Sequence, residues 1–148
     1  MAATRTATVT WTGDLTSGSG TVSAGTSELF TDLPVSWASR TEQPPEGRTS
    51  PEELLAAAHA SCFAMALSSD LAKAGNPPEE LHVSATVTFD RREEKWTVVS
   101  SALDVIGSVP GLDAEGFDRA AEGAKDNCPV SRALKGNVEM SVHATLEE

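Results

Sequence analysis

The sequence predicts an α+β fold with antiparallel sheet, formed by residues 1–148 as a single domain. Three observations predict it: strand-like segments flank one long apolar helix, a second helical region comes near the C-terminus, and short polar turns separate consecutive strands. Such turns suit hairpins better than crossover connections. The expected order is strands, helix, two strands, two helices and strand, in a chain long enough to bury one core.

The first third of the chain predicts a small group of strands. Residues 6–15 are rich in Thr, Val and Trp, and the TSGSG run at 16–20 is suited to a hairpin turn before a second short strand at 21–23. A third strand is expected at 28–33. The segment 37–48, WASRTEQPPEGR, is expected to be a loop carrying charges, because Pro44-Pro45 and Gly47 rule out an ordinary helix or central strand.

Residues 50–75, SPEELLAAAHASCFAMALSSDLAKAG, predict one long helix. Ser50 is a good N-cap, Pro51 suits the first helical position, and Glu53 completes a capping box, while Gly75 supplies a left-handed C-cap. No formal charge occurs from 54 to 69, and apolar or small residues occupy every face. We therefore expect a buried central helix enclosed by protein on all sides, whose Ala/Ser-rich run is too short for a membrane span.

The rest of the chain predicts two hairpin strands, two helices and a closing strand. Residues 81–90 alternate apolar and polar side chains, a charged turn follows at 91–94, and a second strand runs from 96 to about 107. Asp113 is expected to cap a helix that runs to about 126. After Cys128-Pro129 a short helix is expected at 130–134, and 138–146 alternates as the last strand.

Composition excludes several classes of partner and site. A net charge of -11 argues against a nucleic-acid backbone or an anionic membrane surface as partner. The N-terminus has no apolar core of signal-peptide type, so a cytoplasmic protein is expected. Neither clustered metal ligands nor a Walker or dinucleotide-binding motif is present, so we expect no metal and no organic cofactor.

Cys62 lies in the middle of the predicted helix, where desolvation raises a thiol's pKa and would leave it inert unless a cation offset the effect. Arg40 and Arg48 in the preceding loop each offer a guanidinium, which would need a carboxylate such as Glu52. Glu52 and Cys62 are about 15 Å apart along one helix. Two antiparallel copies of the helix would place Glu52 of one chain opposite Cys62 of the other, which predicts a homodimer with sites between chains.

Cys128 and His59 each leave two interpretations open. Cys128 precedes Pro129 at the start of a short helix, where it is either a stabilised thiolate or an N-cap without chemistry, and the residues do not decide which thiol attacks. His59 stands one helical turn before Cys62, so a Cys/His nucleophile pair is geometrically feasible. A helix-packing histidine with a hydrogen-bond partner is the favoured interpretation.

Two long motifs carry a resemblance that extends over essentially the whole chain. TSPEELLAAAHASCFAMAL and DNCPVSRAL, with WTGDLTSGSGTVS and VPGLDAEGFDRAAEGAK, resemble the family of osmotically inducible protein C and organic hydroperoxide resistance protein. The resemblance implies an intertwined two-fold homodimer with antiparallel sheets wrapped around central helices. It matches Cys62 to the peroxidatic cysteine, Cys128 to the resolving cysteine and Glu52 to the family glutamate. Arg40 matches the arginine of the osmotically inducible branch, which is favoured because the first hairpin holds no arginine, although Arg48 in a longer loop leaves the choice of arginine open.

The resemblance implies a cysteine-based peroxidase of the oxidative and osmotic stress response. It would reduce alkyl or lipid hydroperoxides, and hydrogen peroxide less well, through a Cys62 sulfenic acid that Cys128 resolves as a disulfide. An external dithiol, in the family a lipoyl-bearing protein, would then restore the thiols. Two alternatives stay open: a thiol hydrolase that uses Cys62 with His59, and an acidic dimer that binds an apolar ligand and whose cysteines are structural.

Overall fold

The protein is described by a computed structural model that covers residues 1–42 and 47–148. The chain divides into two compact units, Met1–Pro51 and Glu52–Glu148, and each is described by itself. The expected Pro44-Pro45 interruption lies outside the described residues.

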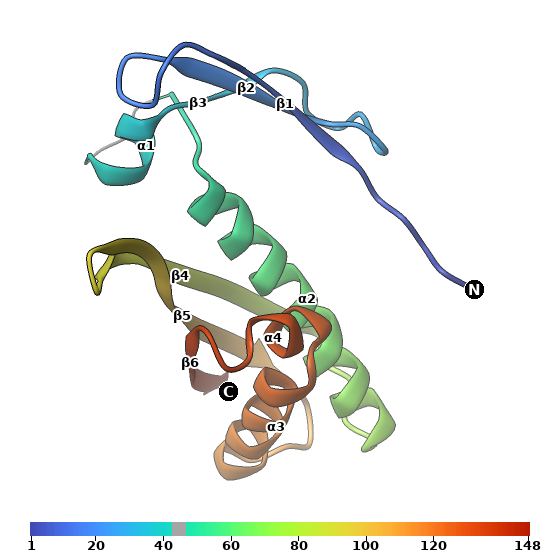
Figure 1. Ribbon diagram of the computed structural model, residues 1–148. Coiled ribbons are helices and arrows are strands. Elements are labelled where there is room, and N and C mark those ends of the chain that lie inside the picture. The colour runs from blue at the N-terminus through green and yellow to red at the C-terminus, as the bar shows by residue number, and fades with distance from the viewer. Residues whose placement is uncertain (43–46) are drawn as a thin grey trace. The chain divides into compact units, whose positions relative to one another are not determined.

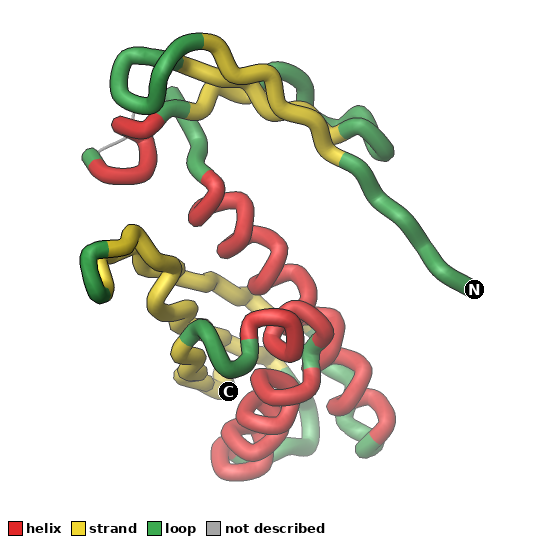
Figure 2. The backbone as a smooth tube through the Cα atoms, viewed as in Figure 1, coloured by secondary structure: helices red, strands yellow, loops and turns green. Residues whose placement is uncertain are grey.

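The unit Met1–Pro51 holds one small antiparallel sheet and a short helix (Figure 2). Strands β1 (Ala7–Thr12), β2 (Ser19–Ala24) and β3 (Leu33–Val35) pair in that order. The hairpin of β1 and β2 is confirmed. The strand expected at 28–33 is wrong, since Glu28 and Asp32 have positive φ angles of 58° and 53°, which an extended strand does not tolerate.

A second correction concerns the expected loop at 37–48. Residues Trp37–Thr41 form helix α1. Ser36 and Ser39 make a reciprocal capping box, in which each side chain accepts from the other's backbone N–H. The start of the segment is therefore helical because a cap precedes it, whereas the prolines that suggested a loop come only after the helix.

The unit Glu52–Glu148 packs its helices against one three-stranded sheet (Figure 1). Helix α2 (Pro51–Lys73) is followed by β4 (Glu80–Arg92), β5 (Lys95–Ser108), α3 (Ala114–Asn127), α4 (Pro129–Leu134) and β6 (Glu139–Glu147). All these elements were expected within a few residues of these bounds. The core is built from the inward residues of α2, β5 and α3: Phe63, Leu67, Leu71, Leu103, Val105, Phe117, Ala121 and Ala124.

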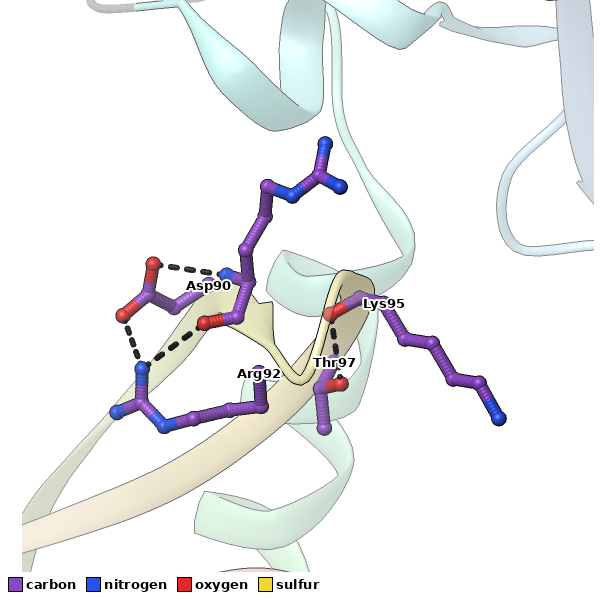
Figure 3. A network of polar contacts seen from close by, with 5 residues as sticks. Asp90, Arg92, Lys95 and Thr97 are labelled. Carbon is purple, nitrogen blue, oxygen red and sulfur yellow. Dashed lines mark hydrogen bonds and ion pairs between the residues drawn. The ribbon is translucent and has the colours of Figure 1, made fainter.

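Strands β4 and β5 form the expected antiparallel hairpin. Its turn is made by Glu93 and Glu94, which adopt positive φ angles of 50° and 68°. Beside the turn, the Asp90 carboxylate accepts from the backbone N–H of Arg91 and from the guanidinium of Arg92 (Figure 3). These contacts stabilise the turn that joins β4 to β5.

The expectation of a purely antiparallel sheet is wrong at β6, which pairs parallel to β5. The sheet order is β4-β5-β6, and the chain leaves β5, passes through α3 and α4, and returns in the same direction. Parallel neighbours need such a crossover, and the two helices between them are long enough to supply it. This crossover carries Cys128 and α4 over the core.

Helix α2 buries one face in its own chain. Its buried residues include His59, Phe63, Leu67 and Leu71, whereas Met65 is 71% exposed. Enclosure on all sides is thus not reached within a single chain. The helix has the length and hydropathy of a membrane span, but Phe63, Leu67 and Leu71 pack in the protein core, which is typical of the core helix of a soluble protein.

Candidate active site

Cys62 is carried by α2, one residue before the buried Phe63. Its side chain is partly buried and packs against the core, and its sulfur receives the backbone N–H of Val130 at 3.5 Å. Because Val130 is the second residue of α4, this contact joins the start of α4 to the middle of α2. The thiol thus faces a second helix of the same unit rather than solvent alone.

Cys128 is fully buried at the junction of α3 and α4, where it is the C-cap of one helix and the N-cap of the other. Its sulfur accepts from the backbone N–H of Ser131 at 3.4 Å and lies 3.0 Å from the Ser131 hydroxyl. The predicted position at the N-terminal end of a short helix is confirmed. Pro129 at the first position of α4 needs no N–H there, as expected.

The two thiols meet inside the unit. Burial raises the pKa of the Cys62 thiol, as the sequence predicted, and the Cys128 side chain raises it further through a hydrogen bond and its charge. The N–H of Val130 acts in the opposite direction and lowers the pKa. Both thiols are free. A partly accessible sulfur beside a fully buried second sulfur is an arrangement that can close to a disulfide.

His59 is fully buried, and both of its ring nitrogens contact serine hydroxyls. Nδ1 lies 2.7 Å from Oγ of Ser101 on β5, and Nε2 lies 2.8 Å from Oγ of Ser131 on α4. Burial lowers the pKa of His59, so the ring is neutral at pH 7. The prediction of a helix-packing histidine with hydrogen-bond partners is confirmed, and the ring is not directed at Cys62 by a hydrogen bond.

Sequence reasoning missed Ser101 and Ser131. Each nevertheless carries a signal: Ser101 occupies an inward position in line with Leu103 and Val105, where an apolar residue is the norm. Ser131 stands three residues after the cap of α4, the spacing at which a backbone N–H meets a cap side chain. A polar residue at a core position points to a buried partner, here His59.

The three charged residues nominated for the site divide between the units. Arg40 lies on α1 with its guanidinium 5.7 Å from the centroid of the Trp37 ring, and Arg48 donates to Oγ of Ser36 at 3.1 Å. Both belong to Met1–Pro51. Glu52 is buried in the first turn of α2, in the unit that carries Cys62 and Cys128.

The donor set does not resemble a metal centre. Across residues 1–42 and 47–148, no group of three or more His, Cys, Asp or Glu side chains is placed to hold a metal ion. The polar groups that contact the sulfurs include the Ser131 hydroxyl and the backbone N–H groups of Val130 and Ser131, none of which is a usual metal ligand. Within the same residues every buried side-chain nitrogen and oxygen has a hydrogen-bond partner.

Comparison with known proteins gives consistent matches. The family model described as OsmC-like protein matches residues 44–143. The chain is 41% identical over 128 residues to peroxiredoxin OsmC of Escherichia coli, a match that covers 86% of this chain and 87% of the relative. It is 32% identical over 103 residues to organic hydroperoxide resistance protein-like 1 of Staphylococcus epidermidis, covering 68% of this chain and 71% of the relative.

Solved structures share the fold. The organic hydroperoxide resistance protein OhrB of Bacillus subtilis superposes with a TM-score of 0.67 at 22% identity, covering 96% of this chain and 98% of that one. A hydroperoxide resistance protein from Elizabethkingia anophelis gives a TM-score of 0.73 at 23% identity, covering 99% of this chain and 100% of that one. These likenesses establish an α+β fold with two small sheets and a long central helix.

Proposed function

The chain belongs to the OsmC-like protein family, and from that premise we propose that it is a thiol-dependent peroxidase that reduces organic hydroperoxides. The observation that carries the proposal is the meeting of two free thiols in one unit: Cys62 on α2 is partly buried and packs against the core cluster that contains Cys128, which lies at the junction of α3 and α4. The identity to a relative named peroxiredoxin OsmC favours the osmotically inducible branch of the family over the organic hydroperoxide resistance branch.

In the proposed reaction, Cys62 attacks as the thiolate on the distal oxygen of the hydroperoxide. The O–O bond breaks, the alcohol leaves after taking up a proton, and Cys62 becomes a sulfenic acid. Cys128 then attacks the oxidised sulfur, water leaves, and a Cys62–Cys128 disulfide remains. An external dithiol reduces this disulfide by exchange. The electrons that reduce the peroxide thus come first from the two cysteines and finally from the dithiol.

A cation has to hold Cys62 as a thiolate, because burial raises its pKa. We assign this role to Arg40, whose guanidinium would also stabilise charge on the peroxide oxygens. Glu52 would orient Arg40 and comes, in this proposal, from the second chain of a two-fold homodimer with shared sites. Light scattering tests the dimer: a monomer at working concentration would contradict it.

The remaining parts of the proposal concern substrate, reductant and compartment. Apolar surroundings of Cys62, such as Phe63 and Ala66, suit alkyl or lipid hydroperoxides better than hydrogen peroxide. The reductant would be a dithiol, with a lipoyl-bearing protein as the family's candidate, and no cofactor enters the oxidative half-reaction. Residues 1–148 act as one hydroperoxide reductase-like domain in the cytoplasm, where thiols are kept reduced.

One experiment separates the peroxidase from the two alternatives. Hydroperoxide consumption is followed with a dithiol for the wild type, Cys62→Ser and Cys128→Ser. The peroxidase predicts no turnover for Cys62→Ser, and for Cys128→Ser a sulfenic acid that over-oxidises with excess peroxide. Undiminished turnover of Cys62→Ser would reject the attacking thiol. A hydrolase would instead cleave an activated ester without Cys128, and an apolar-ligand binder would consume no peroxide. The serine contacts of both His59 nitrogens already disfavour the hydrolase.

A further inference from the structure

A continuous line of buried polar contacts runs from β5 to the sulfur of Cys128. It passes from the Ser101 hydroxyl to Nδ1 of His59 at 2.7 Å, and from Nε2 of His59 to the Ser131 hydroxyl at 2.8 Å. The last contact joins the Ser131 hydroxyl to the Cys128 sulfur at 3.0 Å. Each of these four residues has no exposed surface. We call this line the His59 relay.

The relay has a direction that depends on protonation. In a neutral imidazole one nitrogen donates and the other accepts. When the proton is on Nδ1, it is donated to Ser101, Nε2 accepts from the Ser131 hydroxyl, and the Ser131 oxygen can accept from the thiol of Cys128. When His59 carries a second proton, Nε2 donates to Ser131, and the Ser131 hydroxyl can donate to a Cys128 thiolate. The same contacts therefore serve both protonation states of Cys128.

The surroundings of the His59 ring suit a proton acceptor that is neutral before the reaction. Burial lowers the pKa of His59, so that the ring is neutral before the reaction. Among the described residues, the titratable group that hydrogen bonds link to the ring is the Cys128 thiol, through Ser131, while β5 contributes the Ser101 hydroxyl. One hydrogen-bond partner would be enough to hold a histidine that only packs. Here both ring nitrogens have a partner, and the partner of Nδ1 is Ser101, a serine at a fully buried core position.

We propose that His59 is a positioning residue for the resolving step, which takes the proton of Cys128 through Ser131 as Cys128 attacks the Cys62 sulfenic acid. This inference rests on the proposed peroxidase function and deepens it. The Cys128 thiol gives its proton to Oγ of Ser131, and the hydroxyl proton of Ser131 passes to Nε2 of His59. Cys128 sulfur then forms the S–S bond, the S–O bond of Cys62 breaks, and hydroxide leaves and takes a proton from solvent. His59 later returns its extra proton to solvent, so the net products are the disulfide and water.

The backbone around Cys128 supports the same step. The N–H of Ser131 already points at the sulfur from 3.4 Å and remains a donor when charge develops there. The relay therefore removes a proton on one side while a fixed amide stabilises the resulting anion.

The test separates the two chemical steps in one turnover. Reduced protein is mixed with one equivalent of an alkyl hydroperoxide, and mass spectrometry of quenched samples follows the sulfenic acid and the disulfide from pH 6 to 9. The variants are Ser131→Ala, which interrupts the relay, Ser131→Thr, which keeps a hydroxyl, and Ser84→Ala, an exposed serine on β4 as the matched control. Thermal melts verify that each variant is folded.

We expect Ser131→Ala to form the sulfenic acid at the wild-type rate but to resolve it about 10²-fold more slowly at pH 7, the scale of one general-base contribution. Its resolution rate should recover at high pH, where hydroxide can take the place of the missing proton acceptor, and Ser131→Thr should restore the wild-type pH profile. Resolution by Ser131→Ala with the wild-type rate and profile would overturn the proposal. A wild type that forms neither the sulfenic acid nor the Cys62–Cys128 disulfide with the hydroperoxide would instead reject the proposed function.

A second measurement does not depend on the folding of any relay variant. In reduced wild-type protein labelled with ¹⁵N-histidine at pH 7, the imidazole shifts should show a neutral His59 with its proton on Nδ1. Spectra of His82→Gln and His143→Gln, variants of the two exposed histidines, assign those two signals and leave the third to His59. A proton on Nε2 would leave Ser131 unable to pass a proton to the ring, and would overturn the relay.

Discussion

The backbone N–H of Val130 points at the sulfur of Cys62 from 3.5 Å, so the first turn of α4 lies directly over the thiol of α2. The same turn carries Cys128 as its cap. Two opposing influences therefore reach Cys62 from one short segment: the amide of Val130 lowers its pKa, and the thiol of Cys128 raises it, in addition to the larger rise caused by burial.

Removing the second thiol should make Cys62 more acidic. In Cys128→Ala the hydrogen bond and the charge that raise the Cys62 pKa are lost, while the effect of burial remains. The rate of iodoacetamide alkylation of Cys62, followed by peptide mass spectrometry against pH, should therefore rise at a lower pH than in the wild type. Cys62→Ser supplies the background. An unchanged or higher midpoint would show that Cys128 does not perturb Cys62.

Burial of neutral His59 should make stability fall in mild acid. The pKa of His59 is lowered in the folded protein, so below about pH 6.5 the unfolded chain binds a proton that the folded chain does not. The contribution of neutral His59 to the free energy of unfolding is complete above about pH 6.5. It is lost as the pH falls toward the pKa of His59 in the folded protein, at up to about 1.4 kcal/mol per pH unit.

Urea unfolding at several pH values between 7 and 5 measures this effect. The wild type should lose free energy of unfolding across the range, and the slope should be smaller in His59→Gln, which has no titrating ring. Equal slopes in the two proteins would mean that His59 takes up its proton equally well in the folded state. The lowered pKa values of Asp14 and Asp90 act at lower pH, since an ordinary aspartate titrates near 3.8.

The sequence predicts the elements of the second unit well because its signals are local. Alternation in β4, the Asp113 cap of α3 and the proline of α4 each specify a structure without reference to distant residues. The parallel pairing of β6 with β5 could not be obtained in this way, because strand direction depends on how the α3 and α4 crossover returns the chain.

The candidate site was predictable to a similar degree. The cysteines and the packing role of His59 follow from motif and helical spacing, but the identity of its partners does not. Ser101 and Ser131 come from a strand and a helix far away in the sequence, and only the fold places their hydroxyls beside one ring. In the first unit, Glu28 and Asp32 adopt positive φ angles, which residues other than glycine rarely do. The third strand therefore does not form at 28–33, and residue types alone could not predict this.

Replacing glycine by alanine should change the stability of the protein in opposite directions at Gly107 and Gly123. A Cβ on Gly107 would overlap Cζ of the fully buried Phe117 and lie 3.1 Å from Cδ2 of Leu81, so Gly107→Ala should destabilise the fold by about 1–3 kcal/mol. Gly123 lies in α3 with nothing within 4 Å of such a Cβ, so Gly123→Ala should stabilise by about 0.5–1 kcal/mol. Urea denaturation checks both, and a loss of stability in Gly123→Ala would show that its surroundings are filled.

The two candidate arginines, Arg40 and Arg48, differ in the contacts that their guanidinium groups make. Arg48 donates to Oγ of Ser36, the same atom that caps α1, and so has a structural task in its loop. Arg40 lies one turn along α1, and its guanidinium is 5.7 Å from the centroid of the Trp37 ring. If Arg40 supplies the cation for Cys62, Arg40→Gln should lower kcat/KM for an alkyl hydroperoxide by about 10²–10³-fold, the scale of one transition-state donor. Arg48→Gln should change kcat/KM only a few-fold while lowering the melting temperature, because the lost contact belongs to the helix cap.

Arg40→Lys distinguishes charge from geometry in the same assay. Lysine keeps the positive charge but lacks the planar fork of donors, so a partial recovery of kcat/KM is expected relative to Arg40→Gln. The pH at which Cys62 is alkylated provides the independent readout: it should rise in Arg40→Gln, where the thiolate loses its cation, and stay at the wild-type value in Arg48→Gln. The reverse pattern, with Arg48→Gln raising that pH and losing activity, would transfer the catalytic role to Arg48 and leave Arg40 as a packing residue on Trp37.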